Sequence, residues 1–153
     1  MRRSMAVSMA LVAFLLLTVL AGPGHGSGSQ DEAKALVDKA VAFVKSSGAE
    51  KGLEEFNKPK SQFVKGEYYV FAYDLTGTMV AHPMNAKLVG KNLIDVPDVE
   101  GKLFRKEIVE TAKGKGTGWV DYRYKNPQTG KIESKTTYLH KVDDMILCCG
   151  AYK

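Results

Sequence analysis

Three strand-like runs, separated by two short turns, occupy the C-terminal part of the chain and restrict its fold more than any other feature. The runs cover residues 119–124, 131–142 and 145–152, and each is rich in alternating or β-branched and aromatic side chains. Turn residues at 126–130 and at Asp143-Asp144 separate them. Because turns this short join only antiparallel neighbours, we expect a continuous three-stranded antiparallel sheet.

Two further strand-like segments lie earlier in the chain. Residues 67–73 are rich in aromatic and β-branched side chains, which favour extended structure. Turn residues at 74–78 lead into residues 79–82, which return as the second strand of a hairpin. A helix predicted near residues 102–112 separates this hairpin from the three C-terminal strands.

A helix opens the predicted domain. Its apolar residues recur at the spacing of one helical face: Ala33, Leu36, Val37, Ala40, Val41 and Val44. Asp31 is a suitable N-cap, Ser47-Gly48 a suitable stop, and a second short helix follows at residues 49–56. Together the elements predict an α+β domain: a five-stranded antiparallel sheet, an N-terminal helix, and a helical insertion between the second and third strands.

The N-terminus has the organisation of an export signal. Two arginines precede an uncharged apolar run at residues 9–20, and small residues suited to cleavage follow at 21–26. We therefore expect residues 1–26 to be a signal peptide and residues 27–153 to form one domain, periplasmic or secreted. The alternative is an uncleaved anchor as the sole attachment to a membrane, although the run is shorter than the roughly 20 residues of a spanning helix.

Charge and cysteine content narrow the function classes. The formal net charge of +5 falls to +3 when Arg2 and Arg3 are removed with the signal, and the lysines are scattered, so we expect no nucleic-acid partner. Cys148 and Cys149 are the only cysteines, and adjacent Cα atoms lie about 3.8 Å apart, too close for an ordinary disulfide. We expect two buried free thiols, with a redox role for the pair as the weaker alternative.

Catalytic and cofactor patterns are missing from the sequence. The remaining His and Cys residues have no zinc-type spacing, and no Ser/His/Asp or Cys/His series has a supporting motif. The glycine-rich run at residues 113–118 follows a helix, whereas a phosphate-binding glycine loop precedes one. We therefore expect no enzyme, no cofactor and no metal.

Short motifs follow one another in a fixed order along residues 33–153. They are Asp74-x-x-Gly77, Ala81-His82-Pro83, Leu88-Val89-Gly90-Lys91-Asn92-Leu93, Asp98-x-x-Gly101-Lys102, Gly118-Trp119-Val120-Asp121-Tyr122, Lys135-x-x-Tyr138 and Gly150-x-Tyr152. With these motifs the chain resembles the single Cache family, PAS-like sensor domains that lie outside the membrane in bacterial chemoreceptors and sensor kinases. It departs from the family where Met145-Ile146 and Cys148 replace the more frequent Trp and Gly.

The resemblance implies a sensory function in signal transduction or chemotaxis. Family members bind small organic molecules between the sheet and the helical insertion, often short carboxylates such as pyruvate, lactate, acetate or propionate. Receptor members continue into a second membrane helix, whereas this chain stops at Lys153, so we expect an envelope partner protein to read the ligand state. The alternative is a scaffold that keeps the fold without a ligand and forms homodimers through the N-terminal helix.

The residue types in these motifs suit an anion pocket. Lys135 is a cation in an uncharged run, Tyr122 and Tyr138 each combine an apolar ring with a hydroxyl donor, and His82 can donate from its ring. A small carboxylate needs one positive charge, a few donors and an apolar wall. We predict six ligand-binding residues: Lys135, Tyr138, Tyr122, His82, Trp119 and Phe71.

Strand alternation conflicts with part of this set. Successive strand residues point to opposite faces, which separates Tyr122 from Trp119 and gives Lys135 and Tyr138 opposite parity. Unless a bulge intervenes, Lys135 and Tyr138 cannot both point into one pocket.

Overall fold

The computed structural model describes residues 27–153, and the predicted signal peptide at residues 1–26 lies outside this range. The elements are α1 (Ser27–Ser47), α2 (Ala49–Phe56), β1 (Val64–Lys65), β2 (Tyr68–Tyr69), β3 (Phe71–Asp74), β4 (Met79–Ala81), a 3-10 turn η1 (Ala86–Leu88), α3 (Phe104–Lys115), β5 (Thr117–Lys125), β6 (Ile132–Val142) and β7 (Met145–Tyr152).

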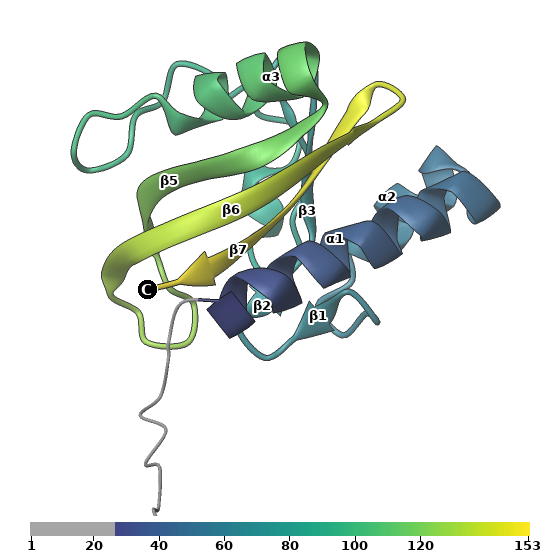
Figure 1. Ribbon diagram of the computed structural model, residues 1–153, viewed down its shortest axis with the longest axis horizontal. Coiled ribbons are helices and arrows are strands. Elements are labelled where there is room, and N and C mark those ends of the chain that lie inside the picture. Colours follow the sequence, from purple (N-terminus) through teal and green to yellow (C-terminus); the bar gives the residue numbers. More distant parts are fainter. Residues whose placement is uncertain (1–26) are drawn as a thin grey trace, which may run out of the picture.

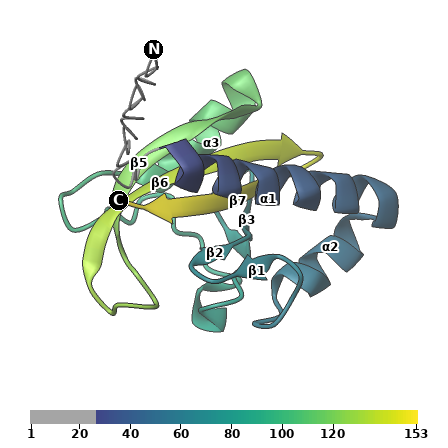
Figure 2. The ribbon, with the colours of Figure 1, turned by 60° about the horizontal axis from the view of Figure 1, so that its bottom comes forward.

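A five-stranded antiparallel sheet in the order β4-β3-β7-β6-β5 forms the centre of the domain. Helix α1 crosses one face and packs against β6 and β7, while α3 packs against β5 on the other face (Figures 1 and 2). The last strand in sequence, β7, is the middle strand in space. The predicted α+β class, the five-stranded sheet and the helical insertion between β4 and β5 are confirmed.

Each face of the sheet has its own hydrophobic core. Because strand side chains alternate, Cys148 belongs to the core beneath α3 and Cys149 to the core beneath α1. Both thiols are free and fully buried, which confirms the prediction from their adjacency. Burial raises the pKa of both thiols above the ordinary value, so neither is poised as a nucleophile.

The predicted apolar face of α1 is buried, but the helix extends beyond it. Ser27 is already helical, so Asp31 lies inside the helix and the prediction that it is the N-cap was wrong. The apolar stripe marks only the part of α1 that packs on the sheet. The predicted end is correct, because α1 ends at Ser47 and Gly48 takes a positive φ of 91°. No helix between residues 27 and 153 is long and apolar enough to cross a membrane.

Residues 67–73 are not one strand, as the sequence predicted, but parts of two. Tyr68–Tyr69 pairs with β1 in a separate two-stranded hairpin, and Phe71–Asp74 pairs with β4 and β7. Between them, the N–H of Val70 donates to the carbonyl of Phe63 at 3.0 Å, so Val70 is still bonded to the β1 side of the hairpin rather than to the main sheet. The sequence pattern merges the two segments because no polar residue separates them.

Helix α3 begins and ends later than the predicted range of 102–112. Its start is delayed because Asp98 organises a turn, accepting the backbone N–H of Lys102 on Oδ1 and that of Arg123 on Oδ2, each at 2.9 Å. Its end is at Gly116, whose φ of 79° closes the helix, whereas Gly114 remains helical. Asp98 therefore fixes the loop before α3 against β5.

Candidate ligand-binding site

Four of the six predicted ligand residues meet in one enclosed cavity beneath α3. The cavity has a volume of about 10 Å³. Nine side chains line it: Tyr69, Phe71, Tyr73, Met79, His82, Phe104, Tyr122, Tyr124 and Lys135. Six of the nine come from β3, β4, β5 and β6. The others are Tyr69 on β2, His82 directly after β4, and Phe104 at the start of α3.

The sheet register explains which residues meet here. Tyr122 on β5 is directly opposite Lys135 on β6, and Lys135 is opposite Tyr152 on β7. Directly opposed residues of antiparallel strands share a face. The side chains of Tyr122, Lys135 and Tyr152 therefore all point to the α3 side.

Lys135 is an uncompensated cation inside this cavity. Its side chain is 1% exposed, and Nζ donates to the hydroxyls of Tyr69 at 3.1 Å and Tyr152 at 3.3 Å. The same ammonium lies 4.6–5.4 Å from the centroids of four rings: Tyr69, Phe71, Tyr124 and Tyr152. Among residues 27–153, no carboxylate forms an ion pair with it.

Burial sets the protonation of Lys135. Loss of water lowers its pKa from 10.5 to about 8. At neutral pH the amine is still mainly protonated, and its immediate neighbours are hydroxyl dipoles and aromatic ring faces. An anion placed beside it would stabilise the protonated form and raise its pKa again.

Gly150 on β7 makes room for the Lys135 side chain. A Cβ at this position would overlap Lys135 Cε and would lie 2.5 Å from Thr137 Oγ1. Thr137 is opposite Gly150 in the ladder, and its hydroxyl is hydrogen-bonded to that of Tyr122 at 2.9 Å. Gly150 is thus required at this point for a close approach, not for its backbone conformation.

His82 presents a donor to the same cavity. Its Nδ1 accepts the backbone N–H of Asn85 at 3.0 Å, and its own backbone N–H donates to Asn57 Oδ1 at 3.1 Å. Burial, followed by the charges of Lys135 and Arg105, lowers the pKa of His82 to about 4. The neutral ring therefore carries its proton on Nε2, and within the described part of the chain no acceptor bonds to this N–H.

Arg105 is a second buried cation, which the sequence analysis missed. It lies in the first turn of α3 and is 5% exposed. Its Nη1 donates to the carbonyl of Val96 at 3.0 Å, and its guanidinium carbon lies 4.2 Å from the centroid of the Phe104 ring. A signal existed, because Arg105 shares the buried stripe of α3 with Ile108 and Ala112 at helical spacing.

Trp119 and Tyr138 lie on the opposite face of the sheet from the cavity. They are directly opposed in the β5–β6 ladder, and their ring centroids are 5.2 Å apart. Lys34 on α1 lies 5.3 Å from the Tyr138 ring, and Trp119 is 38% exposed. The β6 register has no bulge between Lys135 and Tyr138, so alternation places these two predicted ligand contacts away from Lys135.

A surface hollow of about 220 Å³ adjoins the cavity. Seven residues line it: Tyr69, His82, Met84, Asn85, Tyr124, Lys125 and Pro127. The rings of Tyr69, His82 and Tyr124 border both spaces and so form the partition between them. We call this hollow the vestibule.

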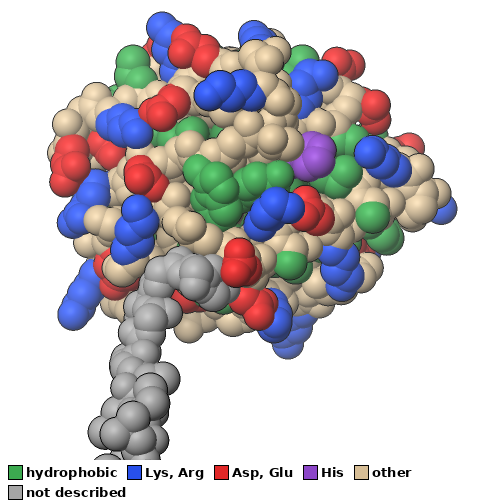
Figure 3. Space-filling view, viewed as in Figure 1, with side chains coloured by type: hydrophobic (Ala, Val, Ile, Leu, Met, Phe, Trp, Pro, Cys, Tyr) green, Lys and Arg blue, Asp and Glu red, His purple; other side chains and the backbone are tan. Residues whose placement is uncertain are grey.

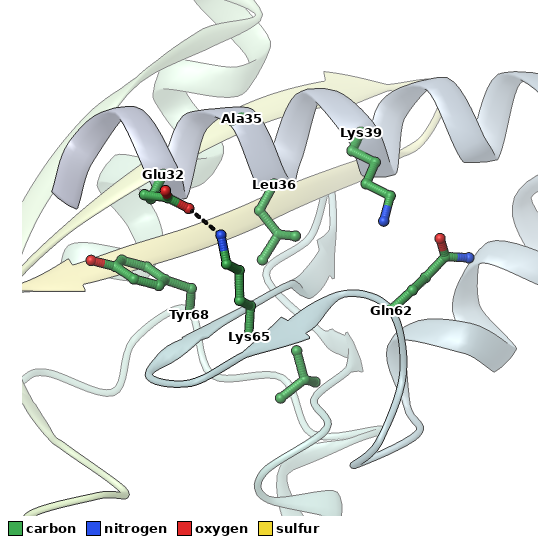
Figure 4. A pocket seen from close by; sticks show the side chains of 8 residues that line it. Glu32, Ala35, Leu36, Lys39, Gln62, Lys65 and Tyr68 are labelled. Atoms are coloured by element: carbon green, nitrogen blue, oxygen red, sulfur yellow. Dashed lines mark hydrogen bonds and ion pairs between the residues drawn. The ribbon is translucent and has the colours of Figure 1, made fainter. Parts of the chain in front are cut away.

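A second groove, of about 340 Å³, lies apart from the cavity, between α1 and the β1–β2 hairpin (Figure 4). Leu36 contributes to its apolar part, and Lys65 reaches across it to Glu32, with Nζ and Oε2 2.9 Å apart. Both charged side chains are exposed, so this ion pair contributes little to stability. On the α1 face of the molecule, basic and acidic side chains are interspersed around a small hydrophobic group (Figure 3).

Residues 15–153 match the model of the single Cache domain 2 family. The chain belongs to this family. The motif resemblance is thereby confirmed, and the chain is a Cache sensor domain of the kind found in chemoreceptors and sensor kinases.

Relatives of this Cache domain are parts of signalling proteins. The sensor histidine kinase MctS of Rhizobium johnstonii is 33% identical over 75 residues, which are 49% of this chain and 16% of the kinase. The chain thus spans less than a fifth of that kinase's length. The periplasmic sensor domain of a chemotaxis protein is 26% identical, with a TM-score of 0.63 over 80% of this chain and 88% of that one.

A further solved Cache chemosensory domain, studied for carboxylic acid recognition, has the same fold. It is 24% identical, with a TM-score of 0.68, and the match covers 82% of this chain and 93% of that chain. The Cache fold places the helical insertion over the sheet face that carries Lys135, and this is the side on which the enclosed cavity lies.

Proposed function

We propose that this Cache domain is an extracytoplasmic sensor that binds a short organic carboxylate beside Lys135. The observation that carries the proposal is the buried ammonium of Lys135, which has no ion-pair partner among residues 27–153. A buried charge without a partner is costly, and a bound carboxylate would supply the missing counter-charge.

The surrounding groups suit such a ligand. The hydroxyl of Tyr69 accepts from Nζ and keeps its own proton to donate, while that of Tyr152 already donates to the Lys125 carbonyl. The Nε2–H of His82 supplies a further donor. Phe71 and Met79 provide apolar wall for a short hydrocarbon part. A solved domain of the same fold was studied for carboxylic acid recognition, which agrees with this ligand class.

Binding requires the cavity to open. A volume of about 10 Å³ accommodates roughly one water molecule, which is too small for a carboxylic acid. The partition of Tyr69, His82 and Tyr124 separates this space from the vestibule, so a shift of these rings would join the two. The joined space is large enough for an acid of a few carbon atoms and disfavours long chains.

The export signal and the sensor relatives support a periplasmic or secreted location. In this proposal, residues 1–26 direct export, residues 27–153 bind the ligand, and an envelope protein reads the bound state. A homodimer through α1 would be one arrangement for that output.

The test is a binding measurement on the exported protein, produced from the full chain. Titration calorimetry and thermal unfolding with acetate, propionate, pyruvate and lactate should reveal at least one ligand. At about 100 times its dissociation constant, a ligand that binds only the folded state adds about 2.7 kcal/mol to the free energy of unfolding.

Variants at two lysines make the test specific. Lys135→Met removes the charge while retaining most of the side-chain volume, and it should weaken binding at least about tenfold. Lys131→Met, in the exposed β5–β6 turn, should leave binding unchanged. If no acid binds a well-folded sample, the sensor proposal fails, and the alternative of a ligand-free envelope scaffold takes its place.

A further inference from the structure

Arg105 lies against the wall of the cavity that holds Lys135. Phe104 and Tyr124 both line the cavity, and their ring centroids are 6.2 Å apart. The Arg105 guanidinium stacks on the Phe104 ring, and both residues also line a surface groove of about 360 Å³ together with Tyr124. Phe104 and Tyr124 therefore stand between the two cations.

The titration behaviour of the cavity residues agrees with this placement. After burial, the charges of Lys135 and Arg105 are the two causes that lower the pKa of His82. Burial raises the pKa values of Tyr73 and Tyr124, and in both cases the Arg105 guanidinium acts in the opposite direction. Arg105 is thus electrostatically part of the compartment that contains these three cavity residues.

This compartment contains two buried cations and no anion. The ion pairs within residues 27–153 include neither Lys135 nor Arg105. Arg105 donates to the carbonyl of Val96 and is a hydrogen-bond partner of the Tyr73 and Tyr124 hydroxyls, but its Nε is buried without a partner. A purely structural arginine would be expected to have its buried donors satisfied.

We infer that the site takes a small dicarboxylate, with Lys135 binding one carboxylate and Arg105 the other. This inference rests on the proposed function and extends it, because a monocarboxylate would neutralise only one of the two buried cations. The second carboxylate would reach Arg105 once the Phe104–Tyr124 wall shifts. It would accept the Nε–H of Arg105, which has no partner among residues 27–153.

The decisive experiment compares acids that differ only in the second charge. Malonate is propionate with its methyl group replaced by a carboxylate, and succinate is related to butyrate in the same way. Calorimetric titration of the exported wild-type protein with both pairs measures the preference directly. We expect each dicarboxylate to bind at least about tenfold more tightly than its monocarboxylate partner.

Variants test whether Arg105 carries this preference. Arg105→Gln should bring malonate and propionate to within about twofold of each other, and Arg105→Lys should retain part of the preference. Lys113→Gln is the control, because Lys113 is an exposed cation in the last turn of the same helix and lines neither the cavity nor the groove. If Arg105→Gln acted only through loop packing, it would weaken the binding of malonate and propionate alike and leave the ratio of their dissociation constants unchanged.

The outcomes separate the inference from the function on which it rests. Equal binding of the two members of each pair, or a preference for the monocarboxylate, overturns the dicarboxylate assignment and leaves the carboxylate sensor intact. A dicarboxylate preference that persists in Arg105→Gln overturns the role of Arg105. Failure of malonate, propionate, succinate and butyrate to bind the folded wild-type protein overturns the dicarboxylate assignment, whereas the sensor proposal falls only if acetate, pyruvate and lactate also fail to bind.

Discussion

Lys135 and Tyr122 lie directly opposite each other across the β5–β6 ladder, and both side chains are buried on the α3 side of the sheet. This pairing puts both side chains on one face of the sheet, where the Lys135 ammonium lies 5.4 Å from the centroid of the Tyr124 ring on β5. Every residue of β6 two positions from Lys135 shares its face, and every neighbour one position away faces α1. The register of β5 against β6 therefore decides which side chains face the candidate ligand-binding site.

Tyrosine hydroxyls on the two faces should respond differently to removal. Tyr122 Oη is buried and hydrogen-bonded to Thr137, whereas no hydrogen bond of Tyr138 Oη occurs within residues 27–153. We expect Tyr122→Phe to lower the free energy of unfolding by about 1 kcal/mol and Tyr138→Phe to change it little. Urea unfolding of both variants measures this difference, and equal losses would contradict the stated difference in hydrogen bonding.

Gly150→Ala should destabilise the domain and weaken ligand binding. The new methyl group would collide with the Lys135 side chain and crowd Thr137, which costs about 1–3 kcal/mol. Gly114→Ala, inside α3 with no atom near the added methyl group, should instead stabilise by about 0.5–1 kcal/mol. Thermal unfolding of the two variants side by side tests the opposite signs. A neutral Gly150→Ala would show that Lys135 is free to move aside.

Stability should rise with pH because of Lys135. Its pKa is about 8 in the folded protein and 10.5 when exposed, so between these values the unfolded chain binds more protons. From about pH 7.5 to about pH 9.5, the wild type should gain roughly 2 kcal/mol relative to Lys135→Met. Urea titrations across this range provide the measurement. Parallel pH profiles of the two proteins would mean that Lys135 is not desolvated.

Asp98→Ala should loosen the loop that precedes α3. The carboxylate accepts backbone N–H groups from Glu100, Lys102 and Arg123, and their loss should cost about 1–2 kcal/mol. Asp98→Asn keeps one acceptor oxygen and should recover part of that stability. Limited proteolysis between residues 89 and 103 reports the loosening locally. Unchanged cleavage rates in Asp98→Ala would rule out this anchoring role.

Local patterns predicted most of the fold. Alternation and turn residues identified β5, β6 and β7, and the apolar spacing identified α1 and α2, because each of these elements buries a regular face. The β1–β2 hairpin escaped prediction because each of its strands is only two residues long, and its second strand lies inside the run 67–73, which the pattern predicts as one strand. Helix propensity also cannot show that hydrogen bonds of the Asp98 side chain make α3 begin later than its apolar pattern predicts.

The candidate site was predicted in part. The motif series indicated Lys135, Tyr122 and His82, and Phe71 was predicted beside them. The fold brings all four to one cavity. Strand alternation alone predicted that Tyr138 and Lys135 point to opposite faces of the sheet. The β6 register has no shift between them, which agrees with this prediction. The position of Arg105 beside Phe104 required the tertiary structure, since an isolated arginine in an amphipathic helix is ordinarily solvent-exposed.

The central position of β7 divides the sheet into two halves that differ in how they assemble. Strands β5, β6 and β7 form a local meander, whereas β3 and β4 join it only through the long-range pairing of β3 with β7. Loop closure makes that pairing the slower event. Phe71 lies on the β3 side of this β3–β7 pairing and Lys135 on the other side. A ligand in the cavity would therefore contact both halves of the sheet and stabilise their pairing.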